Sequence, residues 1–270
     1  MSTDATNPSP ELPAVDERLV APGSGYEILD GIVVPVPPAL PPHATRQSKI
    51  ASLLEAYSRA EYDVATEMLT RTSKIDDIAP DVSVFSRERD PETGGRRLEE
   101  LVVEIISTQT IANAARKAAK LSGRGVRRVF GIDLERGRML EWSRELGTWS
   151  IIDATTDLVD PVLAVPLPFA ALLDAGRTDD AVARALLAKR NPLLEASHAH
   201  VRAEGVAAGR AEGRIETLIE AVLAVLVGRA IPVSAAQRDS IVRERDPAQL
   251  SRWLAAAGTC SDLTSFFNVL

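Results

Sequence analysis

The segment Leu101–Ser107 constrains the fold more than any other part of the chain. Apart from Glu104, its first six residues are apolar on both faces of a strand, and such strands lie in the middle of a sheet that helices cover on both sides. The segment Ile111–Leu121 that follows is rich in Ala and free of Gly and Pro, which is typical of a helix. These two segments predict an α/β domain built around a central strand.

Short strands separated by turns precede and follow this central segment. Tyr26–Leu29 and Ile32–Val36 flank the turn pair Asp30-Gly31, which is a hairpin signal. A helix is predicted over residues 43–57, where apolar residues recur at helical spacing. The other expected strands are Val64–Leu69, Asp81–Phe85, Arg128–Leu134, Met139–Trp142 and Trp149–Ile152. We assign this domain to residues 25–175.

The two ends of the chain differ from this domain in composition. Residues 1–24 combine four prolines with polar residues, and such a segment buries too little apolar surface to offset the entropy of ordering it, so we expect disorder. Residues 176–270 have a helical pattern throughout, with a long helix expected over residues 192–229. We therefore predict a separate, all-helical C-terminal module.

An apolar stripe on the long helix needs a surface to cover it. The stripe consists of Ile215, Leu218, Ile219, Val222 and Leu226. One hypothesis is a homodimer, with the module contributing to assembly or to partner binding and with Gly205, Gly209 and Gly213 allowing another helix to approach. The alternative is that the stripe folds back on the helices after Pro232, using Leu250, Trp253 and Leu254.

Composition excludes several classes of protein. Cys260 is the only cysteine, so no intramolecular disulfide can form and a reducing compartment is expected. The N-terminus lacks a secretory signal pattern, and no apolar run approaches the ~20 residues that span a bilayer. We expect a cytoplasmic protein without membrane contact. A net charge of −7 argues against a protein that coats nucleic acid over its whole surface, but it permits a local basic groove.

Two carboxylates suggest a metal site. Glu104 interrupts an otherwise apolar strand, and an unpaired buried carboxylate costs several kcal/mol, so it should be protonated, paired or bound to a metal. Asp81 begins another strand after Pro80 and could lie beside Glu104. Carboxylates at adjacent strand ends form the hard-oxygen site that Mg²⁺ prefers, with Mn²⁺ as a substitute. The alternatives are that Glu104 pairs with a core Arg and that Asp81 caps a strand or helix.

A run of cations follows the acids and contains no acidic residue. Its members are Arg116, Lys117, Lys120, Arg124, Arg127 and Arg128. Carboxylates beside cations suit a reaction at a phosphodiester, in which a metal activates water and a lysine positions the nucleophile or holds the phosphate. A basic helix face is also commonly just solvated, so this pattern favours a metal-dependent phosphoesterase without requiring one.

The order of several motifs resembles the Uma2 family of the PD-(D/E)XK class. The matching segments are Tyr26–Gly31 with the following prolines and His43, Ala79–Val84, Leu101–Ser107 with Thr110, Lys117, and Arg127–Asp133. The resemblance implies a restriction-endonuclease-like mixed sheet flanked by helices. It also implies that Asp81 and Glu104 are metal ligands and that Lys117 is the catalytic lysine.

The resemblance also points to two further site residues. The chain departs from the family pattern at two positions. His43 is singled out by it alone, since a His after prolines is also a common helix-start residue. Glu27 is either a fourth acidic site residue or a charge on the hairpin. Asn113 stands where the family usually has an acid, and Leu121 replaces a common Tyr.

These observations support a Mg²⁺-dependent endonuclease that hydrolyses DNA, as a homodimer because nucleases that cut both strands often work in pairs. The main alternative is a catalytically inactive scaffold of the same fold that binds nucleic acid or protein. A helical oligomer with an inert α/β head is a third hypothesis. The acid-acid-lysine set favours the enzyme, whereas the acidic net charge and Asn113 favour the alternatives.

Overall fold

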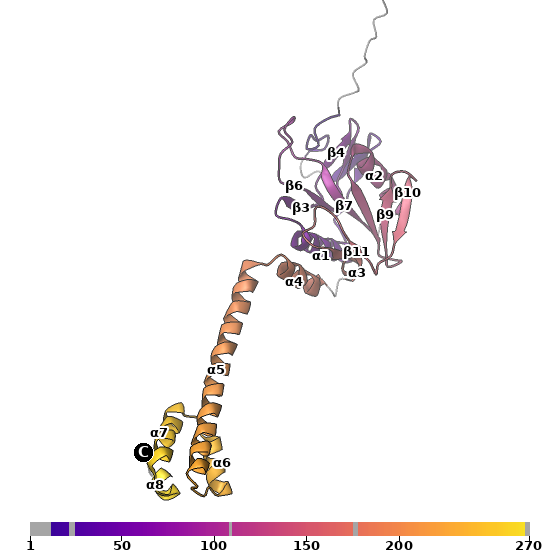
Figure 1. Cartoon of the computed structure of the whole chain (residues 1–270). Helices are drawn as coiled ribbons and strands as arrows, with labels where there is room; N and C mark the ends of the chain where they lie inside the picture. The colour runs from indigo at the N-terminus through magenta and orange to yellow at the C-terminus, as the bar shows by residue number, and fades with distance from the viewer. Residues whose placement is uncertain (1–11, 22–24, 108–109, 175–177, 268–270) are drawn as a thin grey trace, which may run out of the picture. The chain divides into compact units, whose positions relative to one another are not determined.

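The computed structural model describes residues 12–21, 25–107, 110–174 and 178–267 (Figure 1). It divides the chain into two compact units, which separate between Asn191 and Pro192. The division lies later than the expected boundary at residue 175, because helix α4 (Thr178–Ala188) packs its buried Ala181 and Ala185 into the core of the first unit.

A six-stranded mixed sheet forms the centre of the first unit. Its strand order is β10-β9-β8-β7-β6-β3, and only β7 and β8 run parallel. The strands are β3 (Tyr62–Thr66), β6 (Val82–Ser86), β7 (Glu99–Ile106), β8 (Arg128–Asp133), β9 (Arg138–Ser143) and β10 (Thr148–Ile152). The predicted central strand is therefore β7, and the α/β class is confirmed.

Helices cover both faces of this sheet, and successive side chains of β7 point alternately toward one face and the other. Leu101, Val103 and Ile105 lie in one core with helix α1 (Pro41–Tyr57). Val102 lies in a separate core with helix α2 (Ile111–Arg124). Because successive side chains of a strand point to opposite faces, Glu104 lies on the same face as Val102, beneath α2.

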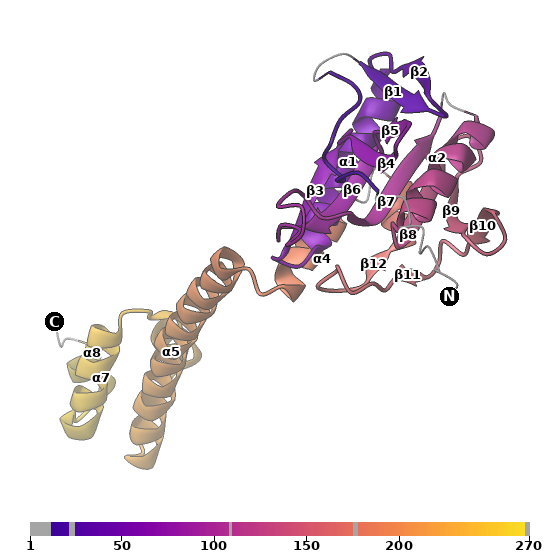
Figure 2. The ribbon, with the colours of Figure 1, turned by 90° about the horizontal axis from the view of Figure 1, so that it is seen from above.

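A smaller four-stranded sheet packs beside α2 and has the order β2-β1-β5-β4 (Figure 2). The predicted hairpin forms strands β1 (Tyr26–Leu29) and β2 (Ile32–Pro35). Strands β4 (Thr70–Ser73) and β5 (Asp76–Ile78) were not expected. Their residues are mostly polar, so no apolar alternation predicts them.

Short elements complete the first unit. Strands β11 (Asp157–Leu158) and β12 (Leu167–Pro168) pair with each other, and helix α3 (Phe169–Leu173) follows. Phe169 and Leu172 join the core beneath α1. The segment after β10 thus packs into the core of the first unit.

The expected disorder of residues 1–24 is wrong for residues 12–21. Val15 and Val20 are buried, and the carbonyl of Val15 accepts a hydrogen bond from the Arg71 amide at 2.9 Å. The buried Asp77 carboxylate accepts from the Leu19 amide at 2.8 Å. Contacts with the rest of the first unit thus order residues 12–21, although their composition alone predicts disorder. Residues 1–11 and 22–24 lie outside the described residues.

The second unit consists of helices α5 (Pro192–Gly228), α6 (Ala235–Arg243), α7 (Pro247–Thr259) and α8 (Leu263–Phe267). The apolar stripe of α5 lies in one core with Leu250, Trp253 and Leu254 of α7. This confirms the fold-back alternative, so the stripe gives no support to a homodimer, which stays a prediction. None of the helices in the described parts of the chain is long and apolar enough to cross a membrane.

Candidate active site

The structure brings Asp81 and Glu104 together. Strands β6 and β7 are antiparallel with Val82 opposite Val103, so one step further along the register Asp81 lies opposite Glu104. The Asp81 Oδ2 atom accepts a hydrogen bond from the Ile105 amide at 2.5 Å. This bond fixes the Asp81 carboxylate against the end of β7, next to Glu104.

Lys117 reaches the same place from helix α2. Its Nζ atom lies 2.9 Å from Glu27 Oε1 and 3.7 Å from Glu104 Oε2, and it donates a hydrogen bond to the carbonyl of Ala79 at 3.3 Å. Burial acts to lower the pKa of Lys117, but the carboxylates of Glu104, Glu27 and Asp81 outweigh it and hold this pKa above its ordinary value. This shift favours the protonated, cationic form of Lys117.

Glu27 belongs to this cluster and is not simply a charge on the hairpin. It is only 5% exposed, and its Oε1 atom accepts from the Ala79 amide at 2.7 Å as well as pairing with Lys117. Strand β1 thus supplies a carboxylate that holds both the lysine and the backbone two residues before Asp81.

His43 contacts Asp81 on the opposite side. It is the third residue of α1, and its Nε2 atom lies 3.2 Å from Asp81 Oδ1, while Nδ1 lies 2.9 Å from the Ser107 hydroxyl. The hydrogen bond to Asp81 raises the pKa of His43 above its ordinary value. A helix-start role alone does not account for these two contacts.

Sequence reasoning missed Gln47 and Glu67. Gln47 follows His43 by one helical turn and donates to the Asp81 carbonyl at 2.9 Å, so its spacing from His43 was a usable signal. Glu67 adopts a positive φ of 51° at the end of β3, and its amide donates to the Pro80 carbonyl at 3.1 Å. Nothing in the sequence around Glu67 indicates that the chain turns there.

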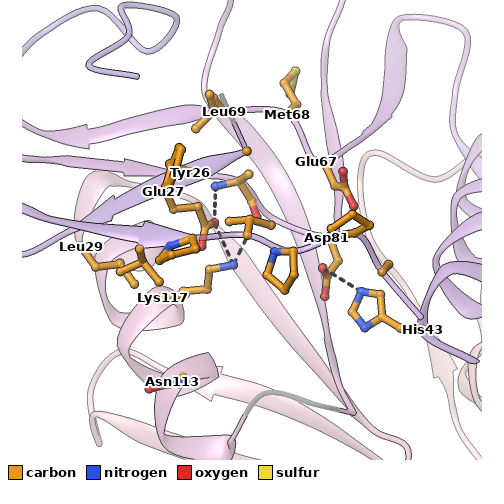
Figure 3. A pocket seen from close by; sticks show the side chains of 18 of the residues that line it. Tyr26, Glu27, Leu29, His43, Glu67, Met68, Leu69, Asp81, Asn113 and Lys117 are labelled. Carbon is orange, nitrogen blue, oxygen red and sulfur yellow. Dashed lines mark hydrogen bonds and ion pairs between the residues drawn. The ribbon is translucent and has the colours of Figure 1, made fainter. Parts of the chain in front are cut away.

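Glu27, His43, Glu67, Asp81 and Lys117 line a pocket of about 880 Å³. Figure 3 shows Glu27 with Lys117 in one part of it and Asp81 with His43 in another, with Glu67 nearby and Asn113 on α2. Glu104 is fully buried and lies behind the pocket lining. The site therefore has a buried acid at its base and a charged cluster that faces solvent.

The expected run of phosphate-binding cations is mostly paired within the protein, which corrects one argument from the sequence. The contacts are Arg116 with Asp30 at 2.6 Å, Lys120 with Asp30 at 2.6 Å and Asp76 at 2.9 Å, Arg124 with the Pro13 carbonyl at 2.6 Å, Arg127 with Asp160 at 2.6 Å, and Arg128 with Glu141 at 2.7 Å. Of the six, only Arg116 and Lys117 line the pocket. Acids distant in the sequence pair with Lys120, Arg127 and Arg128, and a backbone carbonyl accepts from Arg124.

The donor set fits one hard divalent cation. Three carboxylates, those of Glu27, Asp81 and Glu104, surround the single ammonium of Lys117, so the cluster has excess negative charge. Among the described residues, no group of three or more His, Cys, Asp and Glu side chains is arranged to hold one ion. Mg²⁺ is commonly held by one or two carboxylates with water completing its shell, and Asp81 with Glu104 meets that requirement.

Comparison with known proteins agrees with this architecture. A family model described as "Uma2: Putative restriction endonuclease" matches residues 12–173. A crystal structure described as "a putative nuclease belonging to DUF820 from Anabaena variabilis ATCC 29413" is 17% identical, with a TM-score of 0.46, covering 55% of this chain and 89% of that chain. No curated protein matches the chain. Since the family model covers more than half of its length, this chain belongs to the Uma2 family of restriction-endonuclease-like proteins.

Proposed function

We propose that this protein is a Mg²⁺-dependent endonuclease that hydrolyses phosphodiester bonds of DNA. The observation that carries the proposal is that Asp81 and Lys117 line one pocket and that the buried Glu104 lies beside both of them, although the three residues come from different elements. Family membership supports a nuclease, and the charge excess of the cluster supports a bound cation.

Asp81 and Glu104 would hold the metal. When bound, Mg²⁺ supplies a Lewis acid for the phosphoryl oxygen and lowers the pKa of a coordinated water. Asp81 suits this role because the Ile105 amide, the His43 ring and the buried strand fix its two oxygens in place. Glu104 suits it because its burial keeps competing water away.

Lys117 would act as a fixed positive charge. The surrounding carboxylates raise its pKa and so favour the protonated ammonium form. A permanent ammonium can orient the attacking water or neutralise charge that develops on the phosphate. Glu27 is a positioning residue in this scheme, since its bond to Lys117 Nζ fixes where the ammonium lies.

The two departures from the family pattern have different weight. Asn113 lines the pocket, where its amide can donate or accept hydrogen bonds but adds no negative charge. Leu121 is completely buried in the core between α2 and the sheet, so the hydroxyl that a Tyr would bring is replaced by packing alone. Neither departure removes a proposed metal ligand.

The pairing of the basic residues within the protein supports the alternative of a catalytically inactive scaffold. Because Lys120, Arg124, Arg127 and Arg128 are engaged within the protein, few charges are left for a broad phosphate-binding face. A protein that binds nucleic acid or a partner without cleavage would keep the pocket and lose the reaction.

A cleavage assay distinguishes the nuclease from the inactive scaffold. We expect the purified protein to cut DNA with Mg²⁺ or Mn²⁺, to stop on chelation, and to lose activity at least about a hundredfold in Asp81→Ala, Glu104→Ala and Lys117→Ala, since an ion contributes several kcal/mol to lowering the barrier. Lys120→Ala is the matched control, because Lys120 lies on the same helix outside the pocket lining. Cleavage that survives Glu104→Ala would contradict the assignment, and binding without cleavage under every metal would favour the scaffold.

A further inference from the structure

Part of the lining of the candidate pocket is apolar, and we call this part the wall. Tyr26, Val36 and Leu40 line it and are 44%, 38% and 63% exposed. Met68 and Leu69 add to the lining from the connection between β3 and β4, near Tyr26 in Figure 3. Proline rings at 35, 37 and 38 line it as well. Side chains of this kind do not bind phosphates or metal ions, so the wall needs a different ligand group.

The cations of the pocket are too few to hold the backbone of a duplex. The lining contains Arg18, Arg116 and Lys117, and Arg116 and Lys117 are already paired with Asp30 and Glu27. A protein that holds duplex DNA through about 6–10 phosphate contacts needs Lys and Arg side chains to neutralise those phosphates. The remaining cations of α2 and the start of β8 are engaged elsewhere. Affinity at this pocket must therefore come mainly from the bases.

The faces of bases are open for stacking on side chains only where the bases are unpaired and unstacked, whereas a duplex offers only base edges in its grooves. Binding of single strands combines stacking on aromatic and apolar side chains with a small number of cations that follow the backbone. Tyr26 supplies one aromatic face, the aliphatic side chains extend it, and Arg18, which is not among the paired cations named above, lies at the same pocket. Its volume, about 880 Å³, is within the range of small-ligand sites, roughly 300–1,000 Å³.

We infer that the substrate is single-stranded DNA, with unpaired bases against the wall formed by Tyr26, Val36 and Leu40 and the scissile phosphodiester beside Asp81 and Lys117. This inference rests on the proposed nuclease function and names its substrate class. Tyr26 and Leu40 are then specificity-determining residues.

Binding and cleavage should be measured separately on the full-length protein. Fluorescence anisotropy with a labelled single-stranded oligonucleotide, and with the same sequence as a blunt duplex, gives affinities in chelator without cleavage. We expect the single strand to bind at least tenfold more tightly. Tyr26→Ala should weaken its binding about tenfold, the order of one stacked base, Tyr26→Phe should keep most of it, and Leu40→Ser should weaken it less.

Ile32→Ser is the matched control, because Ile32 is 64% exposed on the same hairpin and does not line the pocket. A single-stranded RNA of the same sequence shows whether the sugar matters, and the inference requires DNA to bind at least as tightly. Equal binding and cleavage of single strand and duplex, with Tyr26→Ala changing neither, would overturn the inference and leave the nuclease proposal intact. Selective single-strand binding without cleavage under any metal would overturn the nuclease proposal and keep the binding site.

Discussion

Two clusters of charged side chains in the first unit are similar in composition, but the acidic and basic groups match in number in only one of them. In the pocket, Glu27, Asp81 and Glu104 surround one cation, Lys117. The excess of acid there is costly in a folded protein unless a further cation neutralises it.

The other cluster is centred on Asp160, and here acids and cations match. Asp160 accepts hydrogen bonds from Arg127 at 2.6 and 2.9 Å and from Arg128 at 3.3 Å, and the Val162 amide adds another at 3.1 Å. Arg128 also pairs with Glu141. Every charge has a partner inside the protein, so this cluster needs no ligand. An excess of acidic over basic groups, and not burial alone, therefore distinguishes the candidate site from a structural ion pair.

Substitution of Asp160 should give the larger loss of stability. In Asp160→Asn the free energy of unfolding should fall by about 1–2 kcal/mol, because the buried carboxylate loses its charge-assisted bonds to Arg127 and Arg128, which stay partly exposed and paired with other acids. In chelator, Glu104→Gln should cost less than about 1 kcal/mol, since Lys117 keeps its bond to Glu27. Urea denaturation of both variants measures the difference. Equal losses would mean that the two clusters are alike and that the distinction fails.

A smaller effect is expected from pH. Burial acts to raise the pKa of Asp160, but its bonds with Arg127, the Val162 amide and Arg128 outweigh it and lower this pKa below its ordinary value of 3.8. The stability from this carboxylate is then fully present above about pH 3.8 and is lost as pH falls toward the lowered pKa. The stability gap between wild type and Asp160→Asn should therefore shrink on acidification below pH 4. A gap that stays constant or widens down to pH 2 would contradict this assignment.

Much of the fold could be predicted because the spacing of apolar residues along the chain determines which strand and which helix form the cores. The apolar run of β7 and the stripe of α5 identified the centres of both units, and the second unit has no buried polar or charged side chain among its described residues. Strands β4 and β5 were missed because Thr70, Arg71, Asp76 and Asp77 are buried as polar partners. Their burial depends on contacts distant in the sequence.

The candidate site could be predicted in part for the same reason. Glu104 was conspicuous as one acid in an apolar strand, Asp81 was predicted beside it as the first residue of another strand, and the role of Lys117 came from the family resemblance. Glu67 depends on a turn that only the folded chain shows. The pairing of the basic run could not be foreseen, because Asp30, Asp76 and Asp160 approach it only through the fold.

The anomalous scattering of Mn²⁺ in crystals of the full-length protein tests the central claim most directly. The excess negative charge beside Lys117 predicts a strong peak between the carboxylates of Asp81 and Glu104, absent from crystals of Glu104→Gln and retained in Asp160→Asn. A map in which wild-type crystals bind Mn²⁺ only elsewhere, or bind none beside Asp81 at millimolar concentration, would contradict the claim that the unbalanced acids form a metal site.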